Sequence, residues 1–109
     1  MSGDLFTGTL ELLILQVLST ETMHGYRIAH WIKDQSQGVL DVEQGALYPA
    51  LHRLNRKGLI TGEWGETEQG RRARFYRLTA KGRQALDDEL ARWAQHAQAV
   101  NAVLQNVEA

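Results

Sequence analysis

The segment EQGALYPALHRLNRKG, residues 43–58, decides which fold this sequence encodes. Its apolar residues recur at the helical spacing i, i+3, i+4 and i+7 and are Leu47, Ala50, Leu51 and Leu54. Pro49, the only proline of the chain, lies inside this pattern, although it lacks an N–H and its ring crowds the carbonyl of Gly45. A start near Glu43 or Gln44 puts this proline just beyond the first turn, where little backbone hydrogen bonding is lost. We therefore predict a helix over about residues 43–57 that stops at Gly58.

The face of this helix opposite the leucines is compact at its beginning and polar further along. It carries Gly45, Pro49, His52 and Arg56, with Tyr48 and Arg53 beside them. A compact helix start lets the backbone and the positive end of its dipole approach a phosphate. Gln44, His52 and Arg53 also carry hydrogen-bond donors that suit base edges or phosphates. The pattern indicates a DNA-facing helix; the alternative is a kink at Pro49 with Tyr48 packed as a structural ring.

Two further helices are expected before this segment. TGTLELLILQVLST, residues 7–20, has a stripe made of Leu10, Leu13, Ile14, Val17 and Leu18. Leu12 and Leu15 fall outside that stripe, so this helix must bury more than one side. HGYRIAHWIKDQS, residues 24–36, has a stripe made of Gly25, Ile28, Ala29 and Ile32. We expect Thr22 to cap the second helix.

After Gly58 the apolar period changes from that of a helix to that of a strand. LITGEW, residues 59–64, and RFYRLT, residues 74–79, are predicted to be two short strands joined by the polar loop GETEQGRRA. Arg71, Arg72 and Arg74 follow the tip of that loop, from which they could reach a minor groove or a phosphate backbone. Two glutamates on the loop dilute this charge, and simple solvation of the arginines is the alternative.

The last helix, capped by Thr79, has the most regular pattern of the chain. Its apolar residues alternate in steps of four and three over about three heptads and are Leu86, Leu90, Trp93, Ala97, Val100, Leu104 and Val107. We expect this seam to pair two copies of the chain by gripping the spare side of the first helix, at Leu12 and Leu15. A helix that packs only on its own domain is the alternative, although its stripe is usually broader.

The order helix, helix, helix, two-stranded hairpin, long helix predicts a mainly α fold with a small β-hairpin. It is typical of a winged helix-turn-helix DNA-binding domain, here residues 1–79, followed by a C-terminal dimerisation helix, residues 80–109. The charge pattern fits this order, although a solvated charged face would also explain it. Residues 1–42 carry two Lys/Arg and five Asp/Glu, residues 43–83 nine and four, and residues 84–109 one and four. The basic centre indicates a surface that meets an anion.

The composition also excludes several classes of protein. The 109 residues contain no cysteine, which rules out disulfides, thiolate metal sites and cysteine nucleophiles. The histidines lack ligand spacing, and no nucleophile, base and orienting residue can be assembled, so we expect no metal, no cofactor and no enzyme. The start MSGDLFTG has no export pattern, and the apolar stretch LELLILQVL is too short to span a membrane. We expect a cytoplasmic protein without a membrane partner.

Four segments resemble the motifs of PadR-type transcriptional regulators, in the same order and with the same spacings. They are HGYRIA (24–29), EQGALYPALHRLNRKGLI (43–60), EWGE (63–66) and RRARFYRLTAKGR (71–83). The resemblance covers nearly the whole chain, and the single short last helix is similar to the smaller subgroup. It implies a homodimeric winged-helix repressor that binds a palindromic operator, with Tyr26, Tyr48 and Pro49 on the DNA-facing surface. The complete expected DNA-binding set is Tyr26, Gln44, Gly45, Ala46, Tyr48, Pro49, His52, Arg53, Arg71, Arg72 and Arg74.

The resemblance also raises the question of a small effector. Some short PadR-type regulators bind flat aromatic compounds between tryptophans at the dimer interface, and Trp93 occupies a seam position here. An indole face holds a planar ligand well. The alternative is that Trp93 simply fills the interface, and we expect Trp31 and Trp64 to be structural. For the whole protein, the alternative to a DNA-binding repressor is a winged-helix module that binds protein and has no affinity for DNA.

Overall fold

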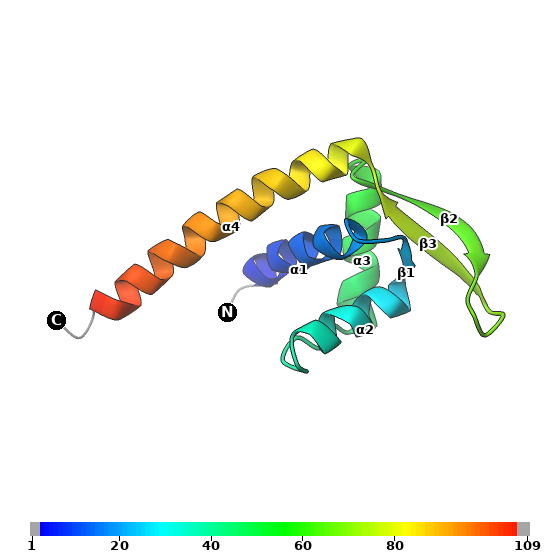
Figure 1. Cartoon of the computed structure of the whole chain (residues 1–109), viewed down its shortest axis with the longest axis horizontal. Helices are drawn as coiled ribbons and strands as arrows, with labels where there is room; N and C mark the ends of the chain where they lie inside the picture. Colours follow the sequence, from blue (N-terminus) through cyan, green and yellow to red (C-terminus); the bar gives the residue numbers. More distant parts are fainter. Residues whose placement is uncertain (1–2, 107–109) are drawn as a thin grey trace.

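The structure is a computed structural model that describes the backbone of residues 3–106 and the side chains of residues 8–106. Three helices come first, followed by a β-hairpin and a long helix, as Figure 1 shows. The elements are α1 (Gly3–Leu18), β1 (Met23–His24), α2 (Gly25–Gln35), α3 (Gln44–Arg56), β2 (Ile60–Glu66), β3 (Arg72–Leu78) and α4 (Ala80–Asn106). The predicted winged helix-turn-helix with a C-terminal helix is confirmed.

The core lies where α1, α2 and α3 meet one face of the hairpin. Its most deeply buried side chains include Ile14 of α1, Ile28 of α2 and Leu47 of α3, each 0% exposed. The helix α1 packs against α2, α3 and α4, and it buries more than one side, as its sequence requires. Leu12 and Leu15, which we expected to remain spare for a second copy, are only 8% and 2% exposed. The chain itself covers that side of α1.

The sheet has three strands in the order β1-β3-β2, so one strand was missing from the prediction. Met23 and His24 pair antiparallel with Tyr76 and Phe75 of β3. This pairing draws residues 23–24 into the sheet, so α2 begins one residue later and Thr22 does not cap it. The cap is His24, whose Nδ1 accepts a hydrogen bond from the backbone N–H of Arg27 at 3.2 Å.

The helix α3 begins and ends where the sequence indicates. Its N-cap is Glu43, which puts Pro49 in the second turn, and a Cβ built on Gly45 would meet nothing within 4 Å. The Gly45 carbonyl, which receives no N–H from Pro49, lies in the first turn of the helix, so a single backbone hydrogen bond near the helix start is lost. The helix stops before Gly58, whose φ of 78° lies in the left-handed region that glycine adopts without strain.

The start of α4 is anchored to the turn between α3 and β2. The Thr79 hydroxyl accepts a hydrogen bond from the Gly82 N–H at 3.0 Å, which confirms the predicted cap, and it lies 2.7 Å from the Gly58 carbonyl. Gly82 packs directly on the Leu59 carbonyl, where a Cβ has no room. Beyond this anchor α4 extends away from the domain, as Figure 1 shows, and the described chain measures 58 × 29 × 23 Å. No helix within residues 3–106 is both long and apolar enough to cross a membrane.

Candidate nucleic-acid interface

The hairpin β2–β3 with its loop 67–71, which we call the wing, leaves an open groove beside α2 and α3. This wing groove has a volume of about 940 Å³. Its lining residues are His24, Gly25, Tyr26, Tyr48, His52, Trp64, Thr67, Gln69, Arg71, Arg72, Ala73, Arg74 and Tyr76. All of them belong to the described part of the chain, and none is a carboxylate. The groove therefore combines three arginines and several aromatic rings without a compensating acidic side chain.

Tyr26 and Tyr48, the tyrosines of the segments HGYRIA and EQGALYPALHRLNRKGLI, both line this groove. The Tyr48 ring lies on Gly25, because a Cβ at that glycine would come within 3.0–3.2 Å of ring atoms. Tyr48 nevertheless keeps 40% of its surface exposed, and Tyr26, in the first turn of α2, keeps 69%. The two predicted roles of Tyr48, packed ring and exposed surface, are therefore combined in one side chain.

The exposed face of α3 continues from this point. Gln44, Gly45, Pro49 and His52 are exposed, whereas Ala46 is half-buried against the core. Gln44 also lines a smaller cleft between α2 and α3, together with Tyr26 and Tyr48. The polar and compact residues of the predicted DNA-facing set thus share one surface with the wing groove.

Arg53 is held differently from the rest of the predicted set. Its Nε donates a hydrogen bond to Oε2 of Glu11 at 2.9 Å, and Lys57 Nζ lies 3.3 Å from Oε1 of the same carboxylate. The Glu11 side chain is only 16% exposed, and that of Arg53 is 33% exposed. One carboxylate of α1 therefore holds two cations of the α3 segment, and its single negative charge offsets one of their two positive charges. This contact spans 42 residues of sequence, and no local pattern indicated it.

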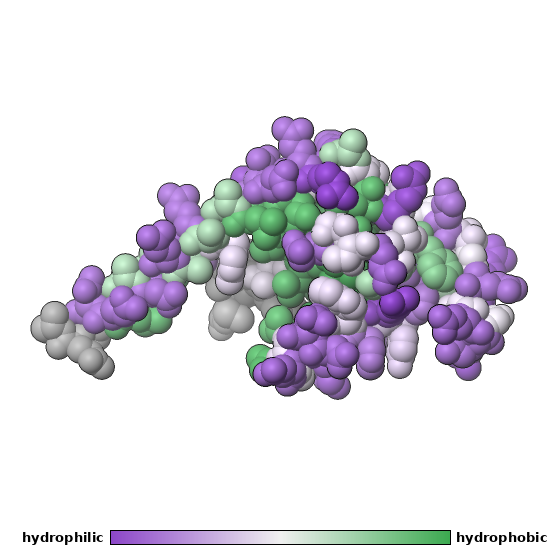
Figure 2. All heavy atoms as spheres, viewed as in Figure 1, coloured by the Kyte–Doolittle hydropathy of each residue, from purple (hydrophilic) through white to green (hydrophobic). Residues whose placement is uncertain are grey.

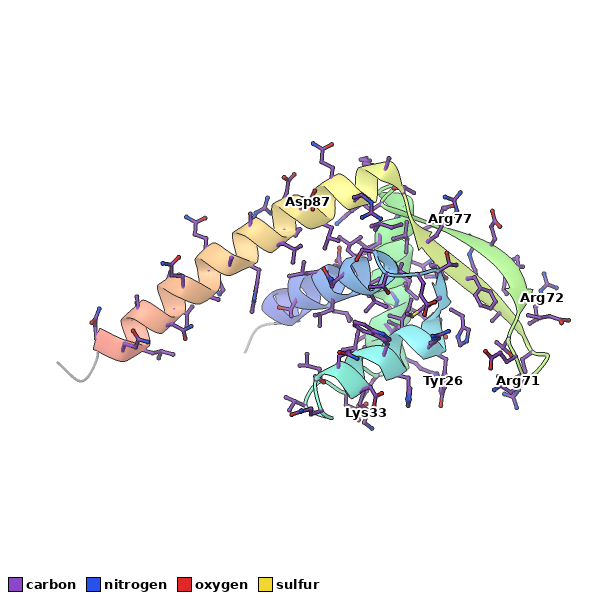
Figure 3. The ribbon with its side chains drawn as sticks, viewed as in Figure 1. Tyr26, Lys33, Arg71, Arg72, Arg77 and Asp87 are labelled. Carbon is purple, nitrogen blue, oxygen red and sulfur yellow. The ribbon has the colours of Figure 1, made fainter. Side chains whose placement is uncertain are left out.

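The wing arginines, Arg71, Arg72 and Arg74, follow a tightly closed loop. The Thr67 N–H donates to the Arg71 carbonyl at 2.8 Å, and the Arg71 N–H donates to the Thr67 hydroxyl at 3.1 Å. In Figure 3, Arg71 points to the same lower edge of the molecule as Tyr26, whereas Asp87 of α4 lies at the opposite edge. No carboxylate within the described range forms an ion pair with any wing arginine. Their charge remains available on the groove side.

Trp64 lies at the site, although the sequence led us to expect a structural residue. It is 59% exposed, and the guanidinium carbon of Arg72 lies 4.6 Å from the centre of its rings. The same atom of Arg74 lies 6.0 Å from Trp64 and 5.9 Å from the ring of Tyr76. The register pairs Trp64 with Arg74 and Gly62 with Tyr76, so these side chains share one face of the hairpin. The alternation of residues in each strand hinted at this face, but the stacking depends on the register.

Tyr76 forms part of the floor of the wing groove and is 8% exposed. Burial raises the pKa of its phenol above the ordinary value of 10.0, because the ionised form is poorly solvated there. Arg74 opposes this shift in the pKa, and Tyr48 adds to it. The phenol therefore stays neutral at physiological pH, and it adds no negative charge to the groove.

The predicted dimerisation seam is divided between core and surface. Leu86 is 4% exposed and belongs to the chain's own core, so it has little area to offer to a second copy. The α4 stripe, which we define as Leu90, Trp93, Ala97, Val100 and Leu104, lies beyond it. Of these residues Ala97 is half-buried, and the other four are 41–64% exposed. Figure 2 shows apolar side chains along the part of α4 that extends from the domain. Val107, the last residue of the predicted seam, lies outside the described residues. The ring centres of Trp93 and His96 lie 6.0 Å apart.

Comparison with known proteins assigns a family to the part of the chain that contains the wing groove and α3. The family model of the Transcriptional regulator PadR-like family matches residues 14–88, which is more than half of the chain. The chain belongs to the PadR-like family. The match extends from α1 through the wing into the start of α4, and thus contains the wing groove and α3 but not the α4 stripe. Among residues 8–106, whose side chains the structure describes, no cluster of three or more potential metal ligands is present.

Individual PadR-like relatives extend the comparison. A solved transcriptional regulator from Clostridium thermocellum has 26% identity and a TM-score of 0.82, covering 94% of this chain and 96% of that chain. The transcriptional regulator YqjI of Escherichia coli is 36% identical over 74% of this chain but only 37% of its own length. Bacillus subtilis PadR, solved in complex with operator DNA, has 28% identity and a TM-score of 0.66, over 74% of this chain and 46% of that chain.

Proposed function

We propose that this PadR-like protein is a cytoplasmic repressor that binds a palindromic DNA operator as a homodimer. The observation that carries the proposal is the wing groove beside α3, which has three arginines and no carboxylate among its described lining residues. Such a surface attracts a phosphate backbone over distance and binds it closely. The relative from B. subtilis solved with operator DNA supports duplex DNA as the partner.

In the proposed complex, the start of α3 enters the major groove. Gln44 and His52 offer donors to base edges, while Gly45 and Pro49 keep the helix surface low enough for close approach. The wing arginines contact the phosphates that flank the groove. Tyr26 and Tyr48 line the path of the backbone between the wing and the helices. In this division of labour the phosphate contacts position the protein and the base contacts select the sequence.

The homodimer is proposed to form through the α4 stripe, with residues 80–109 as the dimerisation helix and residues 1–79 as the DNA-binding domain. Trp93 and Leu104 of this stripe are 45% and 64% exposed. Removing such an apolar surface from water stabilises the association of two chains, which supports a second copy as the partner of the stripe. Two copies related by a twofold axis would present their α3 helices to successive major grooves, about 34–36 Å apart. A palindromic operator matches that symmetry.

Repression is proposed to follow from occupation of the promoter. An aromatic effector stacked on Trp93 would release the repressor by changing the relative position of the two DNA-binding domains. The exposed indole and its position on the α4 stripe support this part of the proposal. Quenching of tryptophan fluorescence by planar aromatic compounds that is absent from Trp93→Phe, with loss of operator binding in parallel, tests it. Binding of such compounds without any effect on DNA affinity contradicts it.

The decisive experiment compares two arginine variants in DNA binding. Fluorescence anisotropy measures the affinity for a duplex from upstream of the protein's own gene at several salt concentrations, and sedimentation measures the oligomeric state. Arg71→Ala with Arg72→Ala should weaken binding to all sequences and lower the salt slope by about 0.9 for each phosphate that is no longer neutralised. Arg77→Ala is the matched control, since Arg77 does not line the wing groove. A stable dimer without salt-sensitive DNA binding would instead indicate a module that binds protein.

A further inference from the structure

The wing holds its arginines in a way that leaves their charge free. Arg72 and Arg74 lie over aromatic rings and form no ion pair with a described carboxylate, with guanidinium carbons 4.6 Å and 6.0 Å from the centre of Trp64. An aromatic face attracts a cation through its quadrupole and does not neutralise it. Glu66, the cross-strand neighbour of Arg72, is close enough in register to compete, yet no ion pair forms between these two described residues.

The hairpin backbone is shaped for this stacking. A Cβ at Gly62 would collide with the Arg74 side chain and come within 3.1 Å of the Tyr76 ring. The absence of a side chain at this position lets Arg74 lie flat across the strand, between Trp64 and Tyr76. Arg74 is accordingly half-buried, although it has no acidic partner among the described residues.

The contrast with Arg53 shows what the stacking achieves. Glu11 forms ion pairs with Arg53 and Lys57, and its negative charge reduces the net positive charge on that side of α3 from two to one. Trp64 orders Arg72 and Arg74 on the groove side without adding a negative charge beside them. An ordered guanidinium that keeps its full charge binds a phosphate with less loss of side-chain entropy than a freely rotating one.

We propose that Trp64 is a positioning residue for DNA binding, which holds Arg72 and Arg74 over its indole so that their guanidinium groups meet the phosphate backbone in a fixed arrangement. This inference rests on the proposed function, because it concerns the same groove. It assigns to Trp64 a role through the arginines and no contact of its own with the bases.

A mutant cycle tests the inference on the full-length protein. The variants are Trp64→Phe, Trp64→Leu, Arg72→Ala with Arg74→Ala, and the combination of Trp64→Leu with both arginine changes. Each is titrated against a mixed-sequence duplex of about three helical turns at several salt concentrations. Thr61→Leu, on the opposite face of β2, is the matched control because it adds a leucine without a change of charge. Thermal unfolding followed by circular dichroism checks that each variant folds.

We expect Trp64→Leu to weaken binding by about two- to fivefold for each guanidinium released, and to lower the salt slope. Trp64→Phe, which keeps a smaller aromatic face, should lose less. In the background without Arg72 and Arg74, Trp64→Leu should have no further effect, because nothing is left for the indole to hold.

Two outcomes overturn the inference while leaving DNA binding intact. The first is wild-type affinity and salt slope in Trp64→Leu. The second is an equal loss on Trp64→Leu whether or not the arginines are present, which would mean that the indole contacts DNA itself or only supports the hairpin. A wild-type protein that binds no duplex in a salt-dependent way would instead contradict the proposed function, so the two failures are distinguishable.

Discussion

Replacing Arg53 tests whether this side chain anchors α3 or reads a base. In the structure its Nε donates to Glu11 at 2.9 Å, with side-chain exposures of 33% for Arg53 and 16% for Glu11. A well-shielded hydrogen bond to a charged group contributes about 1.5–3 kcal/mol, and an exposed ion pair about 0.2–1 kcal/mol. Since this pair is partly screened by solvent, we expect a coupling free energy of about 1 kcal/mol.

Four proteins measure this coupling: the wild type, Arg53→Ala, Glu11→Ala and the double variant. Urea unfolding at one protein concentration, followed by circular dichroism, gives each free energy of unfolding. If the pair anchors α3, the double variant loses about 1 kcal/mol less free energy of unfolding than the two single variants lose together. Lys57→Ala is the control, because the Lys57 side chain is 58% exposed and its contact with Glu11 is longer. Its effect should be smaller.

The anchoring interpretation and base reading make opposite predictions about DNA. A residue that contacts a base edge in two places contributes about 1–3 kcal/mol of discrimination at one base pair. An anchoring residue affects all sequences alike. A coupling free energy indistinguishable from zero, combined with relaxed preference at one operator position in Arg53→Ala, would refute the structural reasoning and restore the base contact that the sequence indicates.

Three further predictions concern packing, assembly and pH. Gly82→Ala should destabilise the chain by roughly 3 kcal/mol in urea unfolding, because its Cβ would overlap the backbone carbonyl beneath it, whereas Gly45→Ala, with nothing within 4 Å, should be neutral or stabilising. Leu90→Glu should convert the dimer to monomer in sedimentation and abolish operator affinity, while Gln95→Glu, off the α4 stripe, should do neither; an active monomer contradicts the proposed assembly. Because the pKa of Tyr76 is raised in the folded protein, this phenol ionises at lower pH in the unfolded chain than in the folded one. Its contribution to the free energy of unfolding is therefore fully present below about pH 10 and is lost as the pH rises further. Tyr76→Phe should remove the part of the alkaline loss of stability that comes from this residue.

Much of the fold could be predicted from the sequence, because helical periodicity and caps are local. The leucine spacing and Gly58 bounded α3 to within a residue at each end, and the hydroxyl of Thr79 marked the start of α4. The tolerance of Pro49 also followed from its distance to the helix start. These signals come from neighbours in sequence, whose relative geometry is set by the backbone itself.

The tertiary structure decided which side chains share a surface. The two-residue strand β1 is too short to show a period, and only its pairing with β3 explains why His24 and not Thr22 caps α2. Leu15 and Leu86 became core residues because α4 starts against α1, which leaves the more distal part of the stripe exposed. The side of an apolar helix that stays free depends on its neighbours in space.

The charges of the candidate site show the same division between sequence and structure. Sequence alone located the basic segment and the arginines of the wing, since charge and loop position are properties of the chain. It did not distinguish Arg53, which is paired with Glu11 across 42 residues, from Arg72, which is stacked on Trp64 through the register of two strands. The electrostatic role of a cation depends on which group lies within a few ångströms of it, and long-range packing and strand register determine that group.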